Sequence, residues 1–193
     1  YLRAHGRKNP AWAGIGIATA LAGDEVRLTN GSWRFSIAAF QKAMALERCL
    51  VVNDFTALAL SLPALGAGDL RAVGGGCAVA GAAIALLGPG TGLGVSGLVP
   101  DASGCYCALS GEGGHVTLSA CNDQEADLLS ILRKKFTHVS AERVLSGAGL
   151  VNLYQAVCAL EGKPARELGP SDVADAAIAG ADPQCVQAVA HFT

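Results

Sequence analysis

The strongest constraint on the fold is an uncharged, glycine-rich stretch from Ala72 to Pro100. Its length alone would suit a transmembrane helix. Gly74, Gly75 and Gly76 open the stretch, however, and glycines recur throughout its second half. A lipid-exposed helix does not tolerate a loop at mid-depth. The pattern therefore predicts two strands, over residues 78–88 and 92–100, joined by a glycine turn, with a membrane-inserted protein as the alternative.

The segment before this stretch alternates between strand and helix patterns. Strands are predicted at residues 12–18, around Val26 and Leu28, and at residues 48–52. Helices are predicted after Ser36, which is a good N-cap, and over residues 56–62, before Pro63. The order strand, strand, helix, strand, helix is typical of an α/β protein.

Helices dominate the remainder, after a weaker strand at residues 106–110. Their predicted starts lie at Asn122 or Asp123, Ser140, Gly149, Ser171 and Pro183. Residues 65–68 are a predicted linker, which divides the chain into predicted domains at residues 1–64 and 65–193.

Composition excludes several function classes. The net charge is −2, with 14 basic and 16 acidic residues, so no basic surface for nucleic acid or an anionic membrane is expected. The seven cysteines are scattered and form no C-x-x-C motif, so no metal site is predicted. Scattered cysteines suggest free thiols and a cytoplasmic location.

A polar pair, Asn53-Asp54, directly follows the apolar run that ends at Val52. Ligands of α/β sheets bind beyond the carboxyl ends of strands. A carboxylate there can take the proton of a substrate hydroxyl, and the amide can fix that hydroxyl. The alternative is structural, because Asp54 could cap the helix that follows.

The sequence "LLGPGTGLGVS", residues 86–96, places G-x-G-T-G-x-G between two apolar segments. The backbone N–H groups of such a turn can close on an anion, and Thr91 adds a hydroxyl donor. It is neither a P-loop nor a Rossmann fingerprint, since no G-K-[ST] occurs and a strand follows the glycines. A plain glycine-rich hairpin is the alternative.

Two further segments carry candidate ligands for hydroxyl groups. Glu112 and His115 are separated by two glycines, which makes a metal-binding helix improbable and favours a loop that presents both side chains. The alternative is a turn with a solvated Glu. Glu142 lies in the predicted first helical turn after Ser140, where an acidic residue also has a purely structural explanation.

In this order, the motifs N-D-F, G-T-G-L-G, G-E-G-G-H and S-A-E-R-V-L-S-G-x-G-L resemble the bacterial glucokinases of the hexokinase group. The stretch "LTNGSWRFS", residues 28–36, is also similar to that family. The resemblance implies an α/β, actin-like and ribonuclease-H-like two-domain fold. It further implies ATP-dependent phosphorylation of glucose at the 6-hydroxyl, with ATP and Mg²⁺ and a possible homodimer.

The resemblance also implies residue roles. Asp54 would be the general base, with Asn53, Glu112, His115 and Glu142 on the other sugar hydroxyls. The second phosphate-binding turn would be formed by Gly90, Thr91 and Gly92.

The family's first phosphate loop, an Asp followed by Gly-Gly-Thr-Asn, does not occur in this sequence, which opens at Tyr1. The adenosine-binding segment belongs beyond Thr193. We therefore expect an internal fragment, incomplete in both domains. A non-catalytic sugar-binding or regulatory remnant of a sugar kinase is the alternative function.

Overall fold

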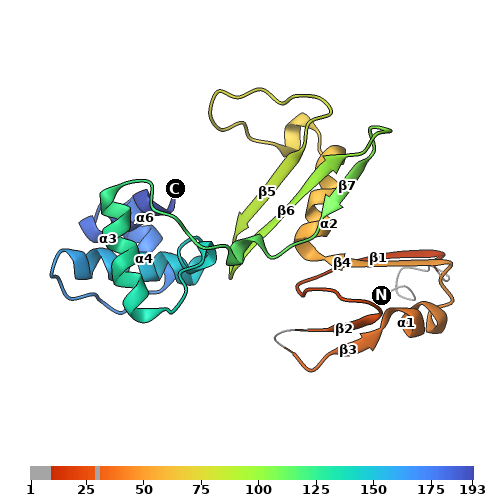
Figure 1. Ribbon diagram of the computed structural model, residues 1–193, viewed down its shortest axis with the longest axis horizontal. Coiled ribbons are helices and arrows are strands. Elements are labelled where there is room, and N and C mark those ends of the chain that lie inside the picture. Colours follow the sequence, from red (N-terminus) through yellow and green to blue (C-terminus); the bar gives the residue numbers. More distant parts are fainter. Residues whose placement is uncertain (1–9, 29–30) are drawn as a thin grey trace. The chain divides into compact units, whose positions relative to one another are not determined.

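The computed structural model describes residues 10–28 and 31–193 (Figure 1). Thr29 and Asn30, within the stretch at residues 28–36 that resembles the family, lie outside the described residues. The contacts divide the chain into two compact units, Tyr1–Leu86 with Ser96–Gly111, and Leu87–Val95 with Glu112–Thr193. The predicted domain boundary between residues 64 and 65 stays a prediction.

The first unit contains the predicted α/β segment. Two strands, β1 (Trp12–Ile17) and β4 (Arg48–Asn53), pair in parallel, with Ile17 opposite Asn53. Helix α1 (Ile37–Ala43) lies between them in the chain, and its N-cap is the predicted Ser36, which accepts a hydrogen bond from the Ala39 N–H. The other elements are β2 (Glu25–Arg27), paired antiparallel with β3 (Arg34–Ser36), and α2 (Asp54–Ser61), which begins earlier than predicted.

The uncharged stretch forms a hairpin of strands, as predicted, and not a helix. Strands β5 (Ile84–Pro89), β6 (Leu93–Pro100) and β7 (Tyr106–Leu109) make one sheet in that order. The first predicted strand begins later than residue 78, because Gly81 has a positive φ of 73° that breaks the extended backbone. No helix in the described part of the chain is long and apolar enough to cross a membrane.

The second unit is mainly helical, and its helices gather beside one another in Figure 1. They are α3 (Asp123–Lys135), α4 (Gly147–Leu160), α5 (Pro170–Ile178) and α6 (Pro183–Phe192). Asn122 caps α3, as predicted, by accepting a hydrogen bond from the Glu125 N–H. Four single turns of 3₁₀ helix complete the described chain, at Leu62–Ala64, Ala67–Asp69, Gly113–His115 and Ala141–Arg143.

Two predicted caps are wrong. Ser140 caps no α-helix, because its backbone forms a β-bridge with Thr117 and only one 3₁₀ turn follows it. Ser171 lies inside α5, which begins at Pro170. The N-cap is Gly169, two residues before Ser171, and its N–H donates to the carboxylate of Asp172, the third residue of the helix, at 2.8 Å.

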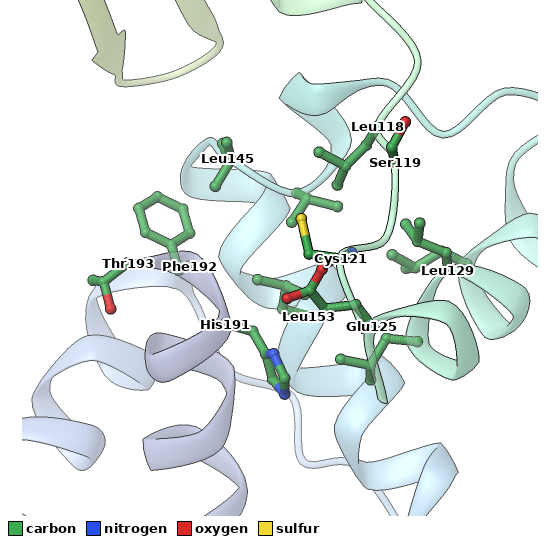
Figure 2. A pocket seen from close by; sticks show the side chains of 13 residues that line it. Leu118, Ser119, Cys121, Glu125, Leu129, Leu145, Leu153, His191, Phe192 and Thr193 are labelled. Atoms are coloured by element: carbon green, nitrogen blue, oxygen red, sulfur yellow. Dashed lines mark hydrogen bonds between the residues drawn. The ribbon is translucent and has the colours of Figure 1, made fainter. Parts of the chain in front are cut away.

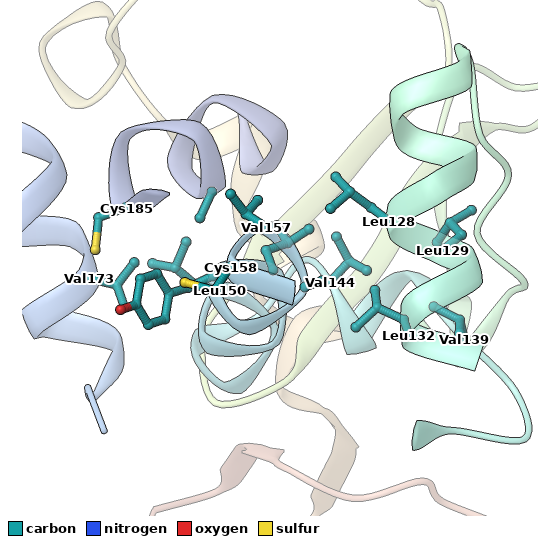
Figure 3. Close-up of a cluster of buried hydrophobic side chains, with 14 residues drawn as sticks. Leu128, Leu129, Leu132, Val139, Val144, Leu150, Val157, Cys158, Val173 and Cys185 are labelled. Carbon is teal, nitrogen blue, oxygen red and sulfur yellow. The ribbon is translucent and has the colours of Figure 1, made fainter. Parts of the chain in front are cut away.

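The core of the second unit lies along α4 (Figure 3). The predicted apolar face of this helix is buried, with the side chains of Leu150, Leu153, Tyr154 and Val157 at most 8% exposed. Burying one such side chain contributes about 1.5–3 kcal/mol relative to leaving it in water. Two free cysteines, Cys158 of α4 and Cys185 of α6, are also part of this core. The cluster therefore holds the segments on either side of α4 in place.

Candidate active site

Asn53 and Asp54 stand where β4 ends and α2 begins. The side-chain oxygen of Asn53 accepts hydrogen bonds from the N–H groups of Phe55, at 2.9 Å, and Thr56, at 3.2 Å. Asn53 is thus the N-cap of α2, and Asp54 is its first residue. The Asp54 carboxylate is exposed and also accepts from the Phe55 N–H, at 3.0 Å. Because the amide supplies the cap, the carboxylate is not needed for that purpose.

The start of α2 is held closely against its neighbours. A Cβ on Gly16 of β1 would lie 3.1 Å from the Ala57 Cβ, so glycine lets the strand approach the helix. On the other side, the hydroxyls of Thr56 and Ser110 lie 3.3 Å apart, and Thr56 is buried. The position of Asp54 is therefore set by a strand, a cap and a side-chain contact.

The predicted phosphate turn connects β5 to β6. The Gly90 N–H donates to the Gly92 carbonyl at 2.8 Å, which closes the turn. The Gly147 N–H, at the start of α4, donates to the Gly90 carbonyl at 2.8 Å. Within the described residues, no hydrogen bond uses the backbone N–H of Thr91 or Gly92. These two groups are the donors that the turn can offer to an anion.

Glu142 lies against this turn. Its Oε2 accepts a hydrogen bond from the Leu93 N–H at 3.0 Å, and the side chain is half-buried. The Glu142 carbonyl accepts from the Ser146 hydroxyl at 2.8 Å. The same Ser146 oxygen accepts from the Gly149 N–H and caps α4. Glu142 thus belongs to the connection that leads into α4.

Glu112 directly precedes a 3₁₀ turn and His115 is its last residue, so the prediction of a non-α-helical loop is confirmed. The His115 Nε2 lies 3.8 Å from the Glu112 Oε2, and both side chains are about 60% exposed. The glycines between them touch β6: a Cβ on Gly114 would lie 2.3 Å from the Leu93 carbonyl oxygen. Glycine is therefore required for this turn to lie directly on the strand.

The second unit brings together the turn at residues 90–92, the segment from Glu112 to His115, and Glu142. All three meet the first residues of β6. Asn53 and Asp54 belong to the first unit, where they begin α2. Sequence reasoning missed Ser146 and Gly147, although a serine just before an apolar-periodic helix is itself an N-cap signal.

The described residues contain no group of three or more His, Cys, Asp or Glu side chains that could hold a metal ion. A pocket of about 270 Å³ lies elsewhere in the second unit, next to α3, α4 and α6 (Figure 2). Most of its wall is apolar, with the polar side chains of Cys121, Glu125 and His191 among its lining. None of the predicted site residues lines it.

Comparisons with known proteins agree along the whole chain. The family model described as Glucokinase matches residues 1–193. A glucokinase of Paramagnetospirillum magneticum is 51% identical over 100% of this chain and 60% of its own length. A glucokinase of Aromatoleum aromaticum is 50% identical over 97% of this chain and 56% of its own length. The chain thus spans well under two thirds of the length of these relatives.

A solved structure supports the same relationship. The crystal structure of a glucokinase from an Antarctic psychrotroph matches with a TM-score of 0.90 and 36% identity, over 99% of this chain and 59% of that chain. A glucokinase of Balamuthia mandrillaris, solved in complex with glucose, matches at 22% identity with a TM-score of 0.68, which shows the fold alone. The predicted fold class, α/β of the actin-like ATPase kind, is confirmed.

Proposed function

The chain belongs to the glucokinase family, and from this premise we propose that the protein transfers a phosphoryl group from ATP to the 6-hydroxyl of glucose. The observation that carries the proposal is 51% identity to a glucokinase over the whole chain. The residue types support it, because an exposed carboxylate, several candidate ligands for hydroxyl groups and a glycine turn are the parts that such a transfer requires. No observation on the described residues favours the non-catalytic alternative.

In this proposal Asp54 is the general base. Phosphoryl transfer depends on positioning and charge stabilisation more than on covalent work by the protein. A carboxylate near the reacting hydroxyl accepts its proton as the oxygen–phosphorus bond forms. The exposed Asp54 carboxylate at the end of β4 is available for this step, since Asn53 caps the helix.

The remaining roles follow from donor and acceptor chemistry. Sugar hydroxyls both donate and accept hydrogen bonds. Each can therefore be bound by one of four groups: the Glu112 carboxylate, the Glu142 carboxylate, the His115 imidazole or the side-chain NH₂ of Asn53. The N–H groups and hydroxyl of the turn at residues 90–92 would hold ATP phosphate oxygens. Mg²⁺ enters with ATP and neutralises phosphate charge.

A homodimer and a cytoplasmic location belong to the same proposal. The location is supported by the seven cysteines, all of which are free thiols, as expected for a reducing compartment.

The test is a pair of matched substitutions in the full-length protein. Asn53-Asp54 begins α2 in the same way that Asn122-Asp123 begins α3, with an asparagine cap followed by an exposed aspartate. Asp54→Asn should lower turnover by about 10²-fold or more, the usual contribution of a general base, with glucose affinity little changed. Asp123→Asn should leave both quantities unchanged.

The measurements are glucose 6-phosphate formation and calorimetric titration of glucose. Turnover of Asp54→Asn close to that of the wild type would refute the base assignment. A correctly folded wild-type protein that neither binds nor phosphorylates glucose would refute the proposed function.

A further inference from the structure

One carboxylate connects the glycine turn to the segment before α4. The Glu142 Oε2 accepts from the Leu93 N–H, the first backbone donor of β6, across 49 positions of sequence. No hydrogen bond within the described residues uses the other carboxylate oxygen, Oε1. A hydrogen bond to an ionised oxygen is stronger than one between neutral groups. One oxygen can therefore hold the turn while the other faces a ligand.

Because Gly92 has no side chain, the Glu142 carboxylate can lie directly against it. A Cβ at residue 92 would lie 2.5 Å from Oε2 and 3.3 Å from the Cδ of Glu142, with no atom of another residue within 4 Å apart from the two chain neighbours. Gly92 is not among the glycines with positive φ in the described chain, so a left-handed backbone is not the reason for glycine there. The absence of a side chain at residue 92 is thus explained by Glu142 and not by the backbone.

The segment around Glu142 and the start of α4 also contacts the turn at a second point. The Gly147 N–H donates to the Gly90 carbonyl, and Ser146 links Glu142 to the cap of α4. The two contacts reach the turn on either side of Thr91. The start of α4 and Glu142 therefore form one support for the turn.

We propose that Glu142 is a positioning residue for the phosphate turn, and that the turn and sugar binding are energetically coupled through its carboxylate. The proposal rests on the proposed function for its sugar part. A sugar hydroxyl on Oε1 orders the same carboxylate that holds Leu93, so each occupied site favours the arrangement that the other needs. Coupling of this kind is reciprocal and typically changes affinity by about 5–150-fold.

Gly92→Ala tests the coupling, because it alters the phosphate turn and leaves every sugar ligand in the sequence. The new methyl group would displace the Glu142 carboxylate, which lies at the end of a flexible side chain. We expect glucose affinity, measured without nucleotide, to fall by about 5-fold or more. Gly68→Ala, at an exposed glycine with nothing within 4 Å of the added Cβ, is the control and should not change it.

The double variant separates this explanation from general damage to the turn. In a Glu142→Ala background the methyl group has space, so adding Gly92→Ala should cause no further loss. Hydrogen exchange of the Leu93 amide in the unliganded full-length protein gives a second readout. Its exchange should accelerate about tenfold or more in Glu142→Ala and in Gly92→Ala, and less in Glu142→Gln, whose amide oxygen can still accept.

Each outcome decides one part. Unchanged Leu93 exchange in Glu142→Ala, or losses that multiply in the double variant, would overturn the positioning role. Normal glucose affinity in Gly92→Ala despite faster Leu93 exchange would overturn the coupling. Expected exchange behaviour in a wild-type protein that binds no glucose would leave the positioning role standing and reject the proposed function.

Discussion

The side-chain oxygen of Asn53 accepts hydrogen bonds from two successive backbone N–H groups, those of Phe55 and Thr56. This bond pair starts α2 and fixes where the neighbouring Asp54 stands. The oxygen of this amide thus caps the helix, while its NH₂ group remains available to donate to a ligand.

Asn53→Ala should lower the free energy of unfolding by about 1 kcal/mol, because the cap is lost. Asn53→Asp should retain the cap, since a carboxylate accepts the same bonds at a helix N-terminus. It should nevertheless weaken glucose binding, because it has no NH₂ donor. Denaturant unfolding and calorimetric titration of both variants measure the two effects. Equal glucose affinity in Asn53→Asp and the wild type would mean that the NH₂ group touches no sugar.

Asp182 should make the second unit sensitive to acid. Burial raises the pKa of Asp182, but hydrogen bonds from the Cys185 N–H, the Arg166 guanidinium and the Gln184 N–H outweigh it, so its pKa lies below the ordinary value. The Arg166 Nη2 lies 2.5 Å from the Asp182 Oδ2. A pKa that is lower in the folded than in the unfolded state gives stability that is present above about pH 4 and lost as pH falls through the folded pKa.

The melting temperature of Asp182→Asn should therefore fall less than that of the wild type when the pH is lowered from 6 to about 3. Asp175→Asn, on an exposed position of α5, is the control and should follow the wild type. Thermal unfolding across this range, followed by circular dichroism, measures the difference. Parallel curves for wild type and Asp182→Asn would show that this carboxylate does not contribute to acid sensitivity.

Gly114→Ala should disturb the turn that carries Glu112 and His115. Its Cβ would meet the Leu93 carbonyl at 2.3 Å, and a backbone atom cannot move aside as a side chain does. We expect weaker glucose binding and a loss of about 1–3 kcal/mol in stability, the usual cost of overpacking. Gly111→Ala, with nothing within 4 Å of the new Cβ, should be neutral in the same titration and unfolding experiments. Wild-type behaviour of Gly114→Ala would contradict the close approach.

Leu150→Ala should destabilise the helical unit by about 2–5 kcal/mol, the range for buried leucines, because the side chain is only 8% exposed. Leu160→Ala lies in the same helix at 41% exposure and should cost clearly less. Urea unfolding of the two variants compares them directly. Similar costs would mean that the core does not distinguish the two faces of α4.

Much of the fold could be predicted from local patterns. Apolar runs located β1 and β4, a predicted cap located α3, and apolar periodicity located α4, because burial of one face and satisfaction of helix ends act over a few residues. Ser140 misled the prediction because pairing with Thr117, which local sequence does not show, extends its backbone. The predicted strand is shorter because Gly81 has a positive φ. Glycine can adopt a positive φ, but the local sequence does not show that it will.

The candidate site could be proposed from residue types and motif order, but its contacts could not be predicted. Asn53-Asp54 was visible because a polar pair interrupts an apolar run. The bond between Glu142 and Leu93 was not, since it joins positions that only the folded chain brings together. The division of labour between Asn53 and Asp54 likewise required the observed hydrogen bonds.

The two thiols of the helical core report the rate at which that unit opens. Cys158 and Cys185 are buried, and burial raises the pKa of the Cys185 thiol, which disfavours the reactive thiolate. Cys77, Cys105, Cys107 and Cys121 are exposed in the folded chain. A thiol reagent should therefore label these four promptly, and it should reach the two core thiols only as fast as the helices separate. The lag between the two classes would measure how fast the core opens, without an engineered label.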